Sequence, residues 1–281
     1  MNLHINYKTS KIIGKIFLYL VIVAGALTSL LPFLWMLSGS LKLDNELYEW
    51  PIRWIPEICR WSNFSEVLDT IPFLTYLFNT TKLSVIITFL QVVTCCLAAY
   101  AFSKIPFPGR DKLFVLYLAT MMIPFQVTMI PQYIIMGKLG LRNTHLAIIL
   151  IQAFSPFGVF LLRQAFVGIP NELSEAARID GCKELGILLR VIVPLCKASI
   201  ATLVTFTFTF VWNDYLGPMI YLNKEELRTI QIGIKSFQTT NGVEYTLILA
   251  ATVMSLAPLI IVYLCCQRYF IESATMSGVK G

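Results

Sequence analysis

Asp214 has the clearest potential for chemistry, because it is the only carboxylate well inside a long apolar block, and Asn213 stands beside it. Ionisable side chains inside a membrane usually face protein or water and are functional candidates. Gln126 and Gln152 add amide groups to two other apolar blocks. These four side chains could line a path for a hydroxylated solute, or they could form hydrogen bonds between helices, and the sequence leaves both interpretations open.

A polar segment between two apolar blocks, residues 169–182, predicts a short helix followed by a sharp turn. Asn171 is a good N-cap, and Glu175 favours the positive end of a helix. Gly181 suits the position just after the helix, where the chain turns with positive φ. A second short helix is expected over 183–193, and Pro194 then suits the first turn of the next apolar helix.

One face of the first short helix is predicted from i, i+3, i+4 and i+7 spacing. It carries Leu173, Ala176, Ala177 and Asp180. The two adjacent alanines would make a small, flat surface that another protein could approach closely. The alternative is an amphipathic loop that lies on the membrane surface without a protein partner.

Patterns typical of enzymes and metal sites are missing from the sequence. No Ser/His/Asp set stands out, and the two histidines, His4 and His145, have no nearby ligand partners. The seven cysteines show no zinc-ligand spacing with histidines. A phosphate-binding loop of the form Gly-x4-Gly-Lys-Ser/Thr is missing too. We therefore expect no catalytic residue, no metal and no cofactor bound by this chain.

The composition indicates an integral membrane protein. The chain has 281 residues, of which 57% are hydrophobic and 14% charged, and its mean hydropathy is +0.71. An ordinary soluble domain is about half apolar and about a quarter charged. The net charge of +6 is basic, but no basic run exceeds two residues, so we set nucleic acid aside.

Six apolar blocks are long enough to cross a bilayer, which takes roughly 20 residues. They cover residues 16–37, 83–102, 113–130, 146–166, 200–221 and 246–270. The first block resembles a signal peptide, but its apolar run continues past the usual length of roughly 7–15 residues, so we expect a retained helix. Pro124, Pro131 and Pro156 predict kinks in the third and fourth blocks.

Orientation follows from the Lys and Arg residues in the connecting segments. Thirteen of the 22 lie in segments that are cytoplasmic if the N-terminus is inside, and nine lie outside. Both termini are then predicted to be cytoplasmic. The longest outer segment, 41–81, contains Trp50, Trp54 and Trp61, which predict either an anchor at the membrane interface or a docking surface for an outside partner.

The loop between the fourth and fifth blocks resembles the cytoplasmic coupling loop of ABC importer permeases. The shared pattern is Glu175-Ala176-Ala177, then Gly181, Val191, Val193 and Pro194. Segments 97–104, 122–126, 160–164 and 212–215 are similar to the carbohydrate-importer branch, and the tail 277–281 resembles that of maltose-type permeases. The resemblance implies one all-α transmembrane domain over 1–281, with its core at about 75–270, and six transmembrane helices.

The resemblance also implies a function in the bacterial cytoplasmic membrane. Two different permease subunits would form one pore, a binding protein would deliver sugar from outside, and two cytoplasmic ATPase subunits would hydrolyse the ATP. The coupling residues would be Glu175, Ala176, Ala177, Asp180, Gly181 and Pro194. A bulky residue at Ala177 or Gly181 is expected to uncouple transport without unfolding the bundle.

The alternative function is an ion-coupled secondary transporter. Such a protein would usually show inverted repeats and more charge inside the membrane. Neither feature is found in this sequence, and the coupling loop would be left without an explanation.

Overall fold

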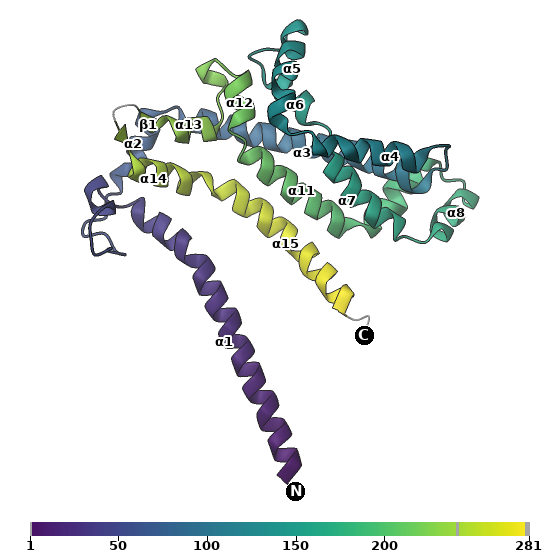
Figure 1. Cartoon of the computed structure of the whole chain (residues 1–281), viewed down its shortest axis with the longest axis horizontal. Coiled ribbons are helices and arrows are strands. Elements are labelled where there is room, and N and C mark those ends of the chain that lie inside the picture. The colour runs from purple at the N-terminus through teal and green to yellow at the C-terminus, as the bar shows by residue number, and fades with distance from the viewer. Residues whose placement is uncertain (1, 240–241, 279–281) are drawn as a thin grey trace. The chain divides into compact units, whose positions relative to one another are not determined.

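The computed structural model describes residues 2–239 and 242–278, so residues 279–281 of the maltose-type tail lie outside the described part. The predicted all-α class is confirmed, since most of the described residues are helical and their strands are limited to one short pair, β1 with β2. The chain divides into two compact units, Met1–Thr70 with Phe237–Met254 and Ile71–Ser236 with Ser255–Gly281. Figure 1 shows the elements of both units.

The first unit is built around one long helix. Its elements are α1 (Asn2–Gly39), η1 (Asp44–Leu47), α2 (Ser62–Thr70), β1 (Gln238–Thr239), β2 (Gly242–Val243) and most of α14 (Tyr245–Ser255). The first apolar block, 16–37, lies inside α1, where Ser10–Gly39 is long and apolar enough to cross a membrane. Its apolar side chains are exposed within this unit, as a helix that faces lipid requires.

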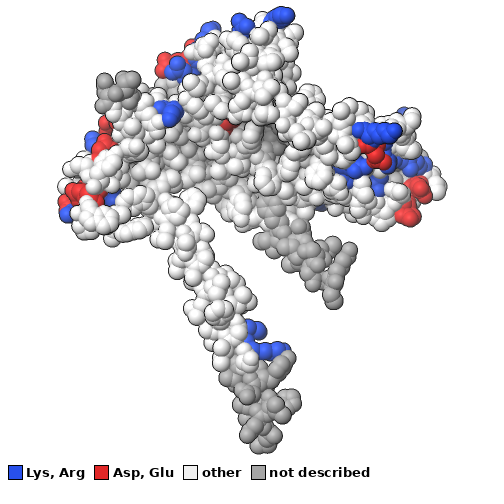
Figure 2. Space-filling view, in the orientation of Figure 1, with Lys and Arg blue, Asp and Glu red and all other residues white. Residues whose placement is uncertain are grey.

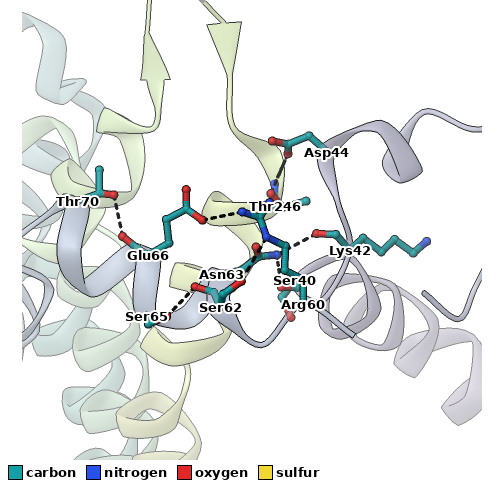
Figure 3. Close-up of polar contacts among 10 residues, drawn as sticks. All are labelled: Ser40, Lys42, Asp44, Arg60, Ser62, Asn63, Ser65, Glu66, Thr70 and Thr246. Atoms are coloured by element: carbon teal, nitrogen blue, oxygen red, sulfur yellow. Dashed lines mark hydrogen bonds and ion pairs between the residues drawn. The ribbon is translucent and has the colours of Figure 1, made fainter. Parts of the chain in front are cut away.

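Asn63 closes the turn that follows α1. Its Nδ2 donates to the carbonyl oxygens of Ser40 at 3.0 Å and Lys42 at 2.9 Å (Figure 3). Asp44 Oδ1 accepts a hydrogen bond of 2.8 Å from Thr246 Oγ1, which ties the start of α14 to the same turn. The Lys42 side chain is fully buried, its ammonium lies over the Trp35 ring, and burial lowers the pKa of this amine.

The tryptophan segment is only partly a loop. Trp50, Trp54 and Trp61 are all exposed, and Trp54 also packs edge-on against Trp35. The predicted segment 41–81 is wrong in its second half, because α2 begins at Ser62 and α3 at Phe73. Hydropathy misses this first part of α3 because polar residues interrupt it. Asn79 lies there, and its side chain donates to the carbonyl oxygens of Glu226 and Arg228.

The second unit contains most of the helices. It comprises α3 (Phe73–Lys104), α4 (Arg110–Ala119), η2 (Thr120–Met122), α5 (Phe125–Lys138), α6 (His145–Gln152), α7 (Pro156–Val167), α8 (Asn171–Ile179), α9 (Glu184–Ile187), η3 (Leu188–Ile192), α10 (Val193–Leu195), α11 (Lys197–Trp212), α12 (Leu216–Tyr221), η4 (Glu225–Leu227), α13 (Ile230–Ser236) and α15 (Ala257–Gly278). Helix α3 packs against α7 and α11, and α11 packs against α15.

Charged side chains of this unit gather at the ends of its helices. Figure 2 shows them around α8 and the start of α4, and at the tips of α5 and α12, while the helices between them show almost none. An uncharged band of this kind is what the hydrocarbon core of a bilayer requires. It agrees with the composition of the apolar blocks.

Three helical stretches, Ser10–Gly39, Phe73–Lys104 and Tyr245–Tyr269, are long and apolar enough to cross a membrane. Three further pairs pass the same test only together: Arg110–Met122 with Phe125–Lys138, His145–Gln152 with Pro156–Val167, and Glu184–Leu195 with Lys197–Trp212. These pairs bend by 97°, 40° and 85°. The described residues therefore give three clear spans, or up to six if each bent pair is one span.

Proline explains two of the breaks that interrupt the predicted blocks. Pro124 follows η2 and precedes α5, and Pro156 begins α7, so the predicted kinks are confirmed at both positions. Pro131 lies inside α5 without ending it. The prediction of one helix over 200–221 is wrong, because α11 ends at Trp212 and α12 begins at Leu216. Pro218 contributes to this break, since proline has no N–H to continue the helical bonds.

Candidate functional site

Helix α8 ends in the turn predicted for it. Gly181 has φ +82°, the Cys182 N–H donates to the Ala177 carbonyl at 2.9 Å, and the Gly181 N–H donates to the Arg178 carbonyl at 3.0 Å. This pair of bonds defines a Schellman motif, which satisfies carbonyls left free at a helix end. The N-cap prediction is wrong, because Asn171 is the first helical residue and its side chain caps nothing. Its Oδ1 instead accepts a hydrogen bond of 2.9 Å from Lys104 Nζ.

The two alanines of α8 differ in burial. Ala177 and Ser174 are buried, and Ala177 belongs to the core cluster that includes Ile187 of α9 and Phe166 of α7. Ala176 is exposed. The predicted face is therefore wrong in one member, because Ala177 turns into the core. A bulky residue at Ala177 would disturb that core, contrary to the prediction that such a variant leaves the bundle folded.

The exposed face of α8 is the part that a partner could touch. It consists of Glu172, Leu173, Glu175, Ala176, Ile179 and Asp180. Ile179 is 87% exposed, so its apolar side chain is accessible to a partner. The surface combines carboxylates with one small alanine, Ala176, and not with the two adjacent alanines that the sequence predicted.

Glu184 joins this helix to α3. Its carboxylate accepts hydrogen bonds from the Arg178 guanidinium, with Nε to Oε1 at 2.7 Å, and from the Tyr100 hydroxyl. The bond to Glu184 raises the pKa of Arg178. Sequence reasoning missed Glu184 and Tyr100. The sequence offers only a weak signal for Glu184, which is an acidic residue two positions after Cys182, in the turn that ends α8.

Pro194 lies beside the bend that leads out of the loop. Helix α9 continues through a π-helical turn, Leu188–Ile192, into α10, and the chain bends by 85° before α11 begins at Lys197. The sequence predicted that Pro194 lies in the first turn of the long apolar helix. This prediction is wrong, because Pro194 lies in α10. The second short helix, expected over 183–193, begins at Glu184.

Two of the four polar residues predicted within the apolar blocks meet in the structure. Gln152 Nε2 donates to Asp214 Oδ2 at 2.7 Å, and Asp214 Oδ1 accepts from the Gly217 N–H at 3.0 Å. Asn213 lies beside them, but its Nδ2 donates to the Thr209 carbonyl of its own helix. Gln126 is exposed on α5, and within the described part of the chain it forms no hydrogen bond with this group.

Three side chains on one face of α3 hold the break between α6 and α7. Gln91 Nε2 donates to the Gln152 carbonyl at 2.7 Å, Thr94 Oγ1 to the Ala153 carbonyl at 2.8 Å, and Cys95 Sγ to the Ser155 carbonyl at 3.5 Å. Pro156 has no N–H to bond the Gln152 carbonyl four residues before it. Neighbouring helices must therefore satisfy these carbonyls, because lipid cannot.

Comparison with known proteins identifies the class of protein. Residues 92–274 match the family described as binding-protein-dependent transport system inner membrane component. The chain belongs to this family. The matched region contains the α8 loop, the three bent helix pairs and the Gln152–Asp214 pair.

Relatives within the family cover nearly the whole chain. The arabinooligosaccharides transport system permease protein AraQ of Halalkalibacterium halodurans is 34% identical over 259 residues, which cover 91% of this chain and 93% of that protein. The lactose transport system permease protein LacG of Rhizobium radiobacter is 30% identical, with 90% of this chain and 92% of that protein covered. The chain is thus similar throughout to sugar permeases of this family.

A solved structure supports the same family assignment. A chain of a bacterial ABC transporter involved in the import of the acidic polysaccharide alginate has a TM-score of 0.78 and 29% identity to this chain. The match covers 93% of this chain and 98% of that one. The protein is therefore a membrane permease of the ABC importer class, and the resemblance that the sequence suggested is confirmed.

Proposed function

We propose that this chain forms half of the pore of an ATP-driven sugar importer, and that α8 is the helix through which separate ATPase subunits drive it. The whole chain, 1–281, would act as one transmembrane domain with six crossings, the three bent pairs counting as one span each. Both termini would lie in the cytoplasm of a bacterium. A second, different permease would form the other half of the pore.

The exposed face of α8 is the observation that carries the proposal. Ala176 stands in its centre, flanked by Glu175 and Asp180, while Gly181 and the buried Ala177 fix the helix against the core. Such a helix is rigidly held on one side and open to a protein on the other. The ATPase subunits would bind this open side and hydrolyse the ATP, because this chain has no phosphate-binding loop of its own.

The names of the relatives support a sugar as the transported solute. They refer to arabinooligosaccharides and lactose, and the solved transporter carries alginate. Gln152 and Asp214, with Asn213 and Gln126 as further candidates, would offer hydrogen-bonding groups to hydroxyls along the path. The family description supports delivery by a binding protein on the outer side.

Purification of the tagged chain in mild detergent, with mass spectrometry and an ATPase assay of the associated proteins, tests this function. We expect a second permease and an ATPase to co-purify, with ATP hydrolysis stimulated by the binding protein. A homo-oligomer that contains no ATPase and transports alone after reconstitution would contradict the proposal and favour an ion-coupled transporter.

Ala176→Trp tests the coupling role of α8 directly. The exposed tryptophan should weaken ATPase association while leaving the permease folded. Ala119→Trp, at an exposed alanine on α4, is the matched control and should retain the ATPase. Full ATPase association in Ala176→Trp would show that this face is not the contact.

A further inference from the structure

Side chains in the last turn of α3 form hydrogen bonds near both ends of α8. At the start of α8, Lys104 Nζ donates to the Ile169 carbonyl at 2.6 Å and to Asn171 Oδ1 at 2.9 Å. Beyond the end of α8, the Tyr100 hydroxyl donates to Glu184, and Glu184 in turn binds Arg178. Residues 100 and 104 are one helical turn apart and lie on the same face of α3.

The same helix also holds the middle of the bundle. Gln91, Thr94 and Cys95, which lie 9 to 13 residues before Lys104 on α3, donate hydrogen bonds to the open carbonyls of the break between α6 and α7. Gln91 Oε1 accepts a further hydrogen bond of 2.9 Å from Thr207 of α11. Helix α3 is continuous over its 32 residues, so it can transmit a displacement along its length.

We propose that Tyr100 and Lys104 make α3 and α8 one rigid lever, so that a displacement of α8 reaches the break between α6 and α7 through Gln91, Thr94 and Cys95. Tyr100, Lys104 and Glu184 are positioning residues in this lever. The inference rests on the proposed role of α8 as the ATPase contact, and it adds the route by which movement of α8 enters the membrane.

The contacts differ from an isolated surface ion pair, which contributes little to stability. Glu184 is shared by two elements, since Arg178 comes from α8 and Tyr100 from α3, and Lys104 supplies a second, independent attachment. Ala177 packs on the core between the two attachments. Two attachments with a packed residue between them prevent rotation as well as separation of the helices.

Spin-label distances in the assembled importer test the lever. Labels go on Lys183→Cys, just after the turn that ends α8 and outside its exposed face, and on Phe89→Cys in α3. Both positions are exposed, and Cys59, Cys182, Cys265 and Cys266 are replaced by Ser. Distances are measured in the nucleotide-free complex and after trapping with ATP and vanadate. We expect the same distance distribution in both states, because a rigid lever moves as a unit.

The double variant Tyr100→Phe/Lys104→Met supplies the decisive comparison. Trapping should then change the distance by about 5 Å, the size of a one-turn shift of one helix past another. Tyr117→Phe, whose ring stacks on Phe102 of α3, is the matched control and should behave as the wild type. If Tyr100 and Lys104 only stabilised the fold, the double variant would have a lower thermal stability in both states, and its label-to-label distance would not depend on nucleotide.

Three outcomes would contradict the lever. The first would contradict the proposed function too, and the other two would contradict the lever alone. Absence of an ATPase from the wild-type preparation would overturn the proposed function and the lever with it. An assembled wild type whose distance changes on trapping would overturn the lever alone. So would a double variant that keeps the wild-type distance in both states.

Discussion

The side chain of Gln152 donates a hydrogen bond of 2.7 Å to the Asp214 carboxylate, and this bond joins two broken helices. Gln152 is the last residue of α6, before the break that Pro156 imposes, and Asp214 lies in the break between α11 and α12. Each break leaves backbone groups that a neighbouring element must satisfy. The pair is therefore a structural joint as well as a candidate contact for a transported hydroxyl.

Gly217→Ala is predicted to disrupt this joint. A Cβ at Gly217 would overlap Oδ2 of Asp214, the atom that accepts from Gln152. We expect a loss of about 1–3 kcal/mol in the free energy of unfolding, as for other overpacked sites, measured by denaturation in detergent. Gly25→Ala is the control, because nothing lies within 4 Å of a Cβ there. Equal stability of the two variants would contradict the prediction.

Gln91→Leu is predicted to destabilise the break between α6 and α7. The substitution removes the donor to the Gln152 carbonyl and the acceptor for Thr207 Oγ1, so two buried groups lose a partner. Each such loss costs about 1–3 kcal/mol. Thr207→Val removes only the second bond and should cost less. A Thr207→Val variant as unstable as Gln91→Leu would show that the carbonyl of Gln152 does not need Gln91.

Local signals in the sequence predicted the elements of this site better than their contacts. Gly181 was predicted correctly because a turn with positive φ depends on the residue itself. Pro124 and Pro156 predicted breaks for the same reason, since a missing N–H acts locally. The family resemblance rested on similarly local patterns, and the comparisons confirmed it.

Contacts between elements distant in the sequence were not predictable from one sequence. Ala176 and Ala177 are adjacent and identical, and only the packing of α8 on Ile187 and Phe166 decides which one is buried. Asn171 looked like an N-cap, but Lys104, 67 positions away, engages its side chain. Tyr100 and Glu184 are 84 residues apart, and neither residue type at its own position indicates the other.

Gly158→Ala is predicted to lower the free energy of unfolding. A second substitution, Cys95→Ala, tests whether a clash with Cys95 is the cause. A Cβ at Gly158 would lie 2.7 Å from Cys95 Sγ and 2.9 Å from Leu203 Cδ1, in the contact between α7, α3 and α11. We expect a cost of about 1–3 kcal/mol in thermal or denaturant unfolding. Adding Cys95→Ala removes the nearer atom and should recover part of the loss. Strict additivity of the two substitutions would mean that Cys95 is not the obstacle.

Gly181→Ala is predicted to strain the end of α8 without a steric clash. Gly181 has φ +82°, a conformation that residues with a Cβ rarely adopt, yet nothing lies within 4 Å of the position its Cβ would take. The expected cost is therefore the backbone term alone, about 1–2 kcal/mol. Asn tolerates this conformation better than Ala, so Gly181→Asn should retain more stability.

Gly186→Ala provides the control for that experiment, because Gly186 lies in α9 and its nearest contact, 4.0 Å from Cys182 Cβ, is ordinary. Alanine in a helix should be neutral or slightly stabilising there. The three variants are compared by thermal unfolding in detergent and by the amount of ATPase that co-purifies. The predicted order of stability is Gly186→Ala, then Gly181→Asn, then Gly181→Ala. ATPase association should fall in the same order, because a strained turn presents the exposed face of α8 in the wrong orientation.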